Sequence, residues 1–207
     1  MIDDNTLIIT REKRKRITNN SIIEHLEINN HMEELIILHC WYLKDITIHG
    51  SVKRLIIEDC NDLTKIRNSN KSIIENLYIH NCNHIVKWPF VQNMAIAYSP
   101  TLKFINNLKF TKVLTIIHCY QLEHLKNYGE NIRLNLIGVS EKLLTKNIIK
   151  HIRRLFIHPN MTLLDIPYIP NLEEFNYRQV PEKYHLIPVY AKGHVDKKIL
   201  RDLFNVL

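Results

Sequence analysis

VKRLIIEDCNDLTKI, residues 52–66, is the stretch that the rest of the chain repeats. Leu55 and Ile57 are separated by one residue, which places both on the same face of an extended strand. Three more apolar residues follow at three-residue steps: Cys60, Leu63 and Ile66. Such steps return an apolar side chain to the interior while the chain turns back. The stretch therefore predicts one coil of a solenoid.

Seven further copies of this pattern follow one another along the chain. Their first two inward positions are Leu35 and Ile37, Leu77 and Ile79, Met94 and Ile96, Leu114 and Ile116, Leu134 and Leu136, Leu155 and Ile157, and Phe175 and Tyr177. With Leu55 included, the copies start 20, 22, 17, 20, 20, 21 and 20 residues apart. A period of this length is typical of repeat proteins, in which each unit buries its apolar face against the next.

The pattern LxxLxIxxCxxLxxI resembles the leucine-rich-repeat family, in the variant with cysteine where asparagine is commonest. The resemblance covers residues 22–180 and implies a curved, β-dominated solenoid with a parallel sheet on its concave face. Twenty residues leave too little chain for a full helix in each coil, so we expect a convex side that is extended or contains short 3-10 segments. A second short strand is expected opposite the main one, at 26–28 and 46–48.

The two ends of the chain break the repeat, and we expect them to cap it. Residues 1–21 form the N-terminal cap, with a short strand at 7–9, and residues 181–207 form the C-terminal cap. The spacing over 139–152 predicts a short helix in one irregular coil, capped by Ser140. Near the C-terminus, residues 194–207 predict an amphipathic helix that lies over the last coil. Its apolar face comprises Ile199, Leu200, Leu203, Phe204 and Leu207.

A basic run at residues 11–16 contributes +4 to the net charge of +7. Its bases are Arg11, Lys13, Arg14, Lys15 and Arg16. We interpret the run as an exposed turn or arm that keeps the protein soluble, with a nuclear localisation signal as the alternative. Five bases reach only a few phosphates, which gives weak binding to nucleic acid at physiological salt.

The cell compartment follows from what the sequence lacks. No run of about 18 apolar residues is present for a membrane span, and the first 16 residues do not have the charge order of a secretion signal. Cys40, Cys60, Cys82 and Cys119 mark the repeat and suggest no paired framework. We therefore expect a monomeric, intracellular and cytoplasmic protein with buried, reduced thiols, which residues 11–16 could also direct to the nucleus.

Several histidines adjoin the cysteines, as in His39-Cys40 and His118-Cys119, and His80 and His84 flank Cys82. Zinc needs four converging ligands, whereas each cysteine here is expected to point inward and the histidine before it outward. No G-x-S-x-G, H-E-x-x-H or glycine-rich phosphate loop occurs. We expect no enzymatic activity, no metal site and no cofactor.

Strand alternation predicts where a partner would bind. The side chains between the inward positions should face solvent on the concave sheet, and many are apolar or aromatic, as anchors of protein interfaces are. High β-propensity is the alternative explanation. The predicted binding residues are Ile36, Leu38, Ile56, Tyr78, His80, Thr115, Ile117, Ile137, Phe156 and His158. Replacing Tyr78 or Phe156 by Ala should then abolish capture of the partner and leave thermal stability nearly unchanged.

The predicted function is that of a non-enzymatic scaffold that binds another protein. A substrate-recognition adaptor of a ubiquitin ligase is an alternative, although it would need a separate adaptor-binding element. A nucleic-acid-binding module would need bases along the sheet. Arg54, Arg133, Arg154 and Arg178 lie there, but Glu34, Glu58 and Glu174 lie among them.

Overall fold

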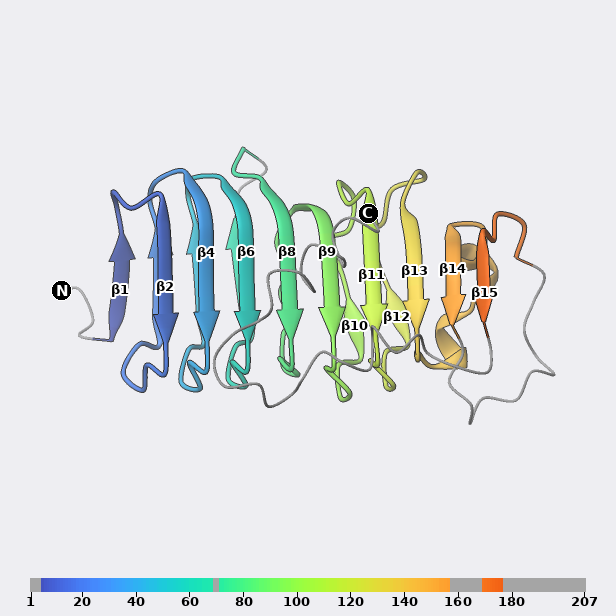
Figure 1. The fold of residues 1–207 in the computed structure, drawn as a ribbon, viewed down its shortest axis with the longest axis horizontal. Coiled ribbons are helices and arrows are strands. Elements are labelled where there is room, and N and C mark those ends of the chain that lie inside the picture. Colours follow the sequence, from blue (N-terminus) through green and yellow to red (C-terminus); the bar gives the residue numbers. More distant parts are fainter. Residues whose placement is uncertain (1–4, 69–70, 157–168, 177–207) are drawn as a thin grey trace.

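The computed structural model describes residues 5–68, 71–156 and 169–176, which form a mostly parallel β-solenoid of about seven turns with almost no helix. Figure 1 shows the strands of its main sheet side by side, from β2 near the N-terminal end to β15. The predicted solenoid of about 20-residue coils is therefore confirmed. The C-terminal cap and its predicted helix at 194–207 lie outside the described residues.

The main sheet has nine strands in the order β15-β14-β13-β11-β9-β8-β6-β4-β2, and every pair is parallel. They are β2 (Arg14–Thr18), β4 (Met32–Leu38), β6 (Val52–Glu58), β8 (Ile74–His80), β9 (Val91–Ala97), β11 (Val113–Ile117), β13 (Arg133–Ile137), β14 (Ile152–Phe156) and β15 (Glu174–Asn176). Leu55 lies opposite Leu35 on one side and Leu77 on the other. Parallel pairing one coil apart thus aligns the inward residues of successive coils.

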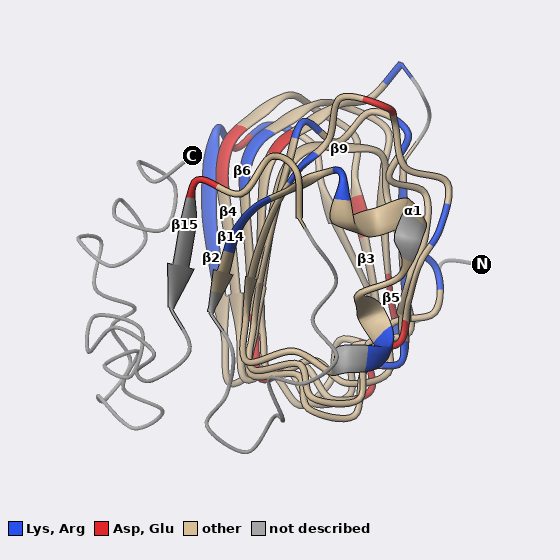
Figure 2. Ribbon diagram, turned by 90° about the vertical axis from the view of Figure 1, so that its right-hand side faces the viewer, with Lys and Arg blue, Asp and Glu red and all other residues tan. Residues whose placement is uncertain are grey.

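A second, smaller sheet lies across the interior from the main one (Figure 2). It is formed by β1 (Thr6–Ile9), β3 (His25–Ile28), β5 (Asp45–Ile48) and β7 (Lys65–Asn68). A two-stranded pair, β10 (Phe104–Ile105) and β12 (His124–Leu125), occurs in later coils. The short strands expected at 7–9, 26–28 and 46–48 are confirmed. In Figure 2 the coils lie almost behind one another, so the stack bends little. We call the side of the main sheet that faces away from the coil interior its outer face.

A continuous apolar core runs through the interior of the coils, from Ile9 to Ile169. The cysteines lie where the chain turns inward from the main strand, and all four are free and buried, as expected. The Cys60 Sγ donates to the carbonyl oxygen of Glu58 at 3.4 Å, and Cys82 makes the same contact with His80 at 3.3 Å. Ser99 takes this place in its coil and donates to the carbonyl oxygen of Ala97 at 3.4 Å. The small side chain at this position both fills the core and satisfies the end of the strand.

One residue in each coil adopts a left-handed conformation directly after the main strand. These residues are Asn19, His39, Asp59, Asn81, Tyr98, His118 and Gly138, with φ between 48° and 57°. The left-handed region favours Asn, Asp and Gly. The backbone N–H of each non-glycine member donates to the next coil, as His39 does to the Glu58 oxygen at 2.9 Å. This conformation turns the chain so that the following cysteine or its equivalent enters the core.

The basic run is not an arm. Arg14, Lys15 and Arg16 belong to β2, the edge strand of the main sheet, which pairs with β4. Ile17 anchors β2 in the core with 7% of its surface exposed. Lys15 occupies the inward position that Leu35 takes in the next coil, and its ammonium lies 3.1 Å from Glu12. An inward-pointing lysine on an edge strand hinders the addition of a further strand.

The irregular coil over 139–152 contains two single helical turns in place of the expected helix. They are the 3-10 turn η1 (Glu141–Leu143) and the four-residue α1 (Lys146–Ile149), and β14 follows at Ile152. The Ser140 Oγ accepts a hydrogen bond from the Lys142 N–H at 3.3 Å, so it caps the first turn. A coil of about 20 residues also needs residues for its strand and for the turns that bring the chain back to the sheet. Too few residues remain for a helix longer than a single turn.

The strand register shifts once, at β14. Leu155 lies opposite Leu136, and Ile152 lies opposite Leu134, with an irregularity between them. The sequence spacing had matched Leu155 with Leu134, which is wrong by two residues. The irregular coil before β14 changes the number of residues in the turn, so the first inward position moves to Ile152.

Candidate functional site

The outer face of the main sheet carries three parallel rows of side chains. The polar row contains Arg14, Glu34, Arg54, Asn76, Asn93, Val113 and Arg133. The middle row contains Arg16, Ile36, Ile56, Tyr78, Ala95, Thr115, Asn135 and Arg154. The turn row contains Thr18, Leu38, Glu58, His80, Ala97, Ile117, Ile137 and Phe156. Strand pairing places neighbours of each row directly opposite one another.

The predicted binding residues lie on this face, in the middle and turn rows, but their predicted exposure is wrong. Exposure is only 0–4% for seven of them: Leu38, Ile56, Tyr78, His80, Thr115, Ile117 and Ile137. Ile36 is half-buried, and Phe156 is placed as the last residue of β14. His158 lies outside the described residues. These side chains point away from the coil interior, as expected, yet they do not meet solvent.

The burial has sharp limits. At the N-terminal end of the sheet, Arg16 and Thr18 are exposed although they lie in the same two rows. The polar row is half-buried or exposed along its whole length. We define the shielded zone as the middle-row and turn-row residues of β6, β8, β9, β11 and β13. Its members are Ile56, Glu58, Tyr78, His80, Ala95, Ala97, Thr115, Ile117, Asn135 and Ile137, all buried except Glu58, which is half-buried.

His80 and Glu58 are neighbours in the shielded zone. The His80 Nδ1 lies 3.9 Å from a Glu58 carboxylate oxygen, at the limit of an ion pair, and neither ring nitrogen has a hydrogen-bond partner. Burial lowers the pKa of His80, and burial together with the nearby Asp59 raises the pKa of Glu58. Each group thus pays a desolvation penalty that the other does not relieve. A neutral His80 ring packs between Tyr78 and Tyr98, with ring centroids 6.4 and 5.4 Å away.

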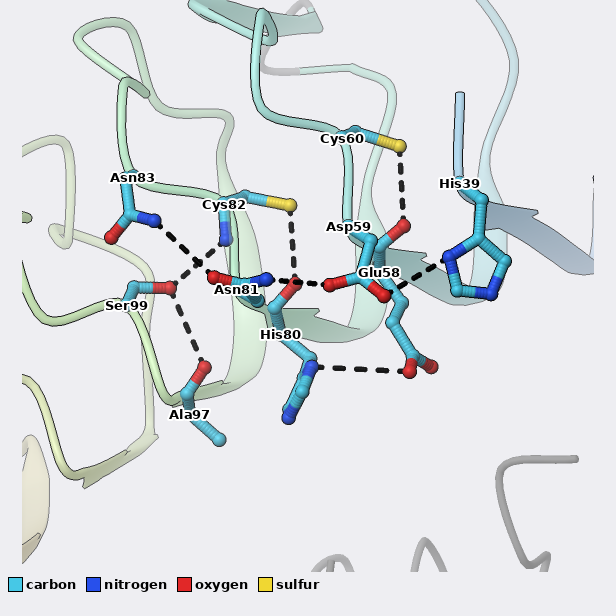
Figure 3. A network of polar contacts seen from close by, with 10 residues as sticks. All are labelled: His39, Glu58, Asp59, Cys60, His80, Asn81, Cys82, Asn83, Ala97 and Ser99. Atoms are coloured by element: carbon cyan, nitrogen blue, oxygen red, sulfur yellow. Dashed lines mark hydrogen bonds and ion pairs between the residues drawn. The ribbon is translucent and has the colours of Figure 1, made fainter. Parts of the chain in front are cut away.

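Beside this pair, polar side chains link successive coils at the end of the main strands (Figure 3). The His39 Nδ1 lies 3.0 Å from the Asp59 carboxylate, and the Asn81 side chain donates to the same carboxylate at 2.6 Å. Asn83 donates in turn to Asn81 at 3.3 Å. These contacts join three coils in the row of left-handed residues. They stabilise the turns that follow the main strands.

Farther along the same edge, aromatic rings continue the contacts between coils. Tyr98 and His118 have ring centroids 5.0 Å apart, and the Tyr120 hydroxyl lies 2.9 Å from the His118 Nδ1. The next left-handed residue along this edge is Gly138, where an added Cβ atom would lie 2.6 Å from the His118 Nδ1. Glycine therefore meets two demands at this position, a positive φ and close approach of the His118 ring.

A hollow of about 420 Å³ lies near the smaller sheet, beside His25, Asp45 and Asp62. His25 and Asp45 are paired at 2.8 Å, and Lys44, which also lines the hollow, is paired with Glu24. Its charges thus largely compensate one another, so they select neither an anion nor a cation. Within the described part of the chain, no three His, Cys, Asp or Glu side chains are grouped so that they could hold a metal ion.

Four members of the shielded zone were missing from the residues predicted by sequence: Glu58, Ala95, Ala97 and Asn135. Alternation within each strand predicts that these residues point outward; Ala95, for example, lies between the inward-pointing Met94 and Ile96. The two alanines carry little apolar surface and so gave no sign of an interface. Asn135 donates to the Thr115 hydroxyl at 3.2 Å, which satisfies a buried amide within the zone.

No helix in the described ranges is long and apolar enough to cross a membrane. Comparison with models of known protein families, with curated proteins and with solved structures found no match for this chain. The function is therefore argued from the chain's own residues and geometry.

Proposed function

We propose that this protein is a non-enzymatic scaffold that binds a partner protein through the outer face of its main sheet. One observation carries the proposal: each of five consecutive strands carries at least one buried apolar or aromatic side chain at an outward position, and six of the ten outward positions in the shielded zone are of this kind. A contiguous apolar surface of this kind is typical of a site that another polypeptide covers. The coils themselves are proposed to be of the leucine-rich-repeat type, which the pattern LxxLxIxxCxxLxxI supports.

The surroundings of the zone also favour a protein partner. The polar row borders it along one side, and a polar rim around an apolar centre is the usual organisation of protein interfaces. Arg54 pairs with Glu34 at 2.9 Å, and the Asn93 side chain donates to Asn76 at 3.1 Å. These groups hold fixed positions from which they could orient a partner backbone.

Nucleic-acid binding finds less support on this face. Arg14 and Arg54 are paired with acids, and Asn76 and Asn93 replace bases in the next two coils. A phosphate backbone needs several unpaired bases in a row, because affinity depends on the number of phosphates neutralised. The basic residues of β2 form part of the sheet edge and are too few to supply that number.

The test compares two isoleucine substitutions in the full chain. Ile36 is half-buried beside the shielded zone, whereas Ile22 is 65% exposed in the loop that precedes β3. Tagged wild-type protein, Ile36→Glu and Ile22→Glu are used to capture partners from cells that naturally make the protein, with quantification by mass spectrometry and then by titration. Ile36→Glu should reduce partner affinity at least tenfold, and Ile22→Glu should retain it. Equal capture by wild type and Ile36→Glu would exclude the outer face.

A further inference from the structure

The shielded zone needs a layer above it. Neighbouring strands lie about 4.8 Å apart and cover the sides of outward side chains, but they leave the tips open. The polar row shows this directly, because the same strands leave Arg54, Asn76 and Asn93 half-exposed. Tyr78, by contrast, is 1% exposed. Among the described residues, the smaller sheet lies on the other side of the interior (Figure 2), so it cannot supply this layer.

The order of the chain limits which segment can cover the shielded zone. Residues 1–4 and 69–70 are too short to cover five strands. Residues 157–168 belong to the connection between the neighbouring strands β14 and β15, in which Leu155 and Phe175 lie opposite each other, so both ends of this stretch are tied to the C-terminal end of the sheet. The remaining candidate is 177–207, the 31 residues that follow β15.

The dimensions of this segment match the zone. Five strands span four spacings, or about 19 Å, and a helix over the 14 residues 194–207 would be about 21 Å long. The segment starts at β15, six strand spacings from β6, or about 29 Å. The 17 residues at 177–193 can extend to roughly 56 Å, so they are long enough to place such a helix anywhere along the zone.

The chemistry also matches. The sequence of 194–207 offers five apolar residues at helical spacing, and the zone offers apolar side chains on all five strands. As a lid over the last coil, the same helix would leave the shielding of β6 to β13 unexplained. We infer that residues 194–207 bind the outer face of the main sheet as an amphipathic helix and occupy the partner-binding surface of the free protein.

This inference rests on the proposed function and adds a means of regulation to it. A partner can bind the zone only when the C-terminal segment leaves it. The apparent affinity is therefore reduced by the fraction of molecules in which the zone is open. Changes that weaken the contact of 194–207 should then strengthen partner binding.

A thiol placed in the turn row tests the inference in the full chain. Ala97→Cys adds a thiol inside the shielded zone, and Thr18→Cys adds one to the same row outside it. The four native thiols are buried, and burial raises the pKa of Cys119 to about 12, so their background reaction with a disulfide reagent is slow. Without any partner present, the added thiol of Ala97→Cys should react at least tenfold more slowly than that of Thr18→Cys.

The helix is then changed on either of its two faces. Leu203→Asp combined with Phe204→Asp alters the net charge by −2 on the apolar face, and Lys198→Asp makes the same change on the polar face. The double change should accelerate reaction of the Ala97→Cys thiol at least tenfold, and Lys198→Asp should not. If all five thiols react, the chain has unfolded, and Leu203→Ala with Phe204→Ala replaces the double change with the same expected order.

Two results would overturn the inference. One is equal reactivity of the thiols in Ala97→Cys and Thr18→Cys, which would mean that the zone is open. The other is continued protection of the Ala97→Cys thiol when the apolar face of 194–207 is altered, which would assign the cover to another segment. Neither result depends on a partner, so failure of this inference is distinguished from failure of Ile36→Glu to affect capture.

Discussion

Replacing Tyr78 by Ala measures directly how strongly the outer face is shielded. The Tyr78 side chain is 1% exposed, and its ring is stacked on that of His80. Burial of a tyrosine removes roughly 150–200 Å² from water, which at about 25 cal/mol per Å² corresponds to about 4 kcal/mol. The substitution should therefore lower the free energy of unfolding by about 3–4 kcal/mol, as large-to-small changes in cores do. This differs from the expectation for a solvated strand position, where stability would hardly change.

Tyr120→Ala is the matched control, because Tyr120 is 46% exposed. It should lower the free energy of unfolding by about 1 kcal/mol or less. Urea titration followed by circular dichroism and by tryptophan fluorescence, to which the buried Trp88 contributes, gives both values. A loss below about 1.5 kcal/mol for Tyr78→Ala, or equal losses for the two variants, would refute the burial of the outer face.

Three further predictions concern the core, the sheet edge and pH. Cys60→Asp should destabilise the protein by several kcal/mol, because it buries a carboxylate without a partner. Thermal unfolding would measure this loss. A melting temperature within roughly two degrees of wild type would place Cys60 outside the core. Replacing Arg14, Lys15 and Arg16 by Ser should lower the free energy of unfolding by about 1 kcal/mol but promote concentration-dependent association through the unprotected edge of β2. Light scattering that stays independent of concentration would contradict this role. Burial lowers the pKa of His80 below its ordinary value of about 6.5, so the unfolded chain takes up a proton at higher pH than the folded one. The free energy of unfolding should therefore fall as the pH decreases from 7 to 5, and His80→Leu should reduce that fall; identical pH profiles for the two proteins would exclude His80 as the cause.

The repeat could be read from the sequence because its information is local. In a solenoid each coil contacts only the coils beside it, so the spacing Leu55-Ile57-Cys60 specifies the strand, the turn and the inward side without reference to distant segments. The structure confirms this spacing from β4 to β13. The left-handed residue directly after each of seven main strands carried a signal as well, since Asn, Asp and Gly fill four of those seven places.

Features that depend on neighbours outside the repeat could not be read in this way. Residues 14–18 have the composition of an arm, and only the open edge of β4 makes them a strand. The register of β14 depends on how many residues the turns η1 and α1 consume, which apolar spacing does not reveal.

The outer face shows the same division most clearly. Alternation in the sequence determined that Tyr78 and Ile117 point away from the coil interior, because side chains on a strand alternate between its two faces. Only the tertiary structure decided that they are buried, because burial depends on what lies above a sheet as well as on the direction of its side chains. Sequence periodicity specifies direction within one element, whereas solvent exposure is a property of all the elements packed together.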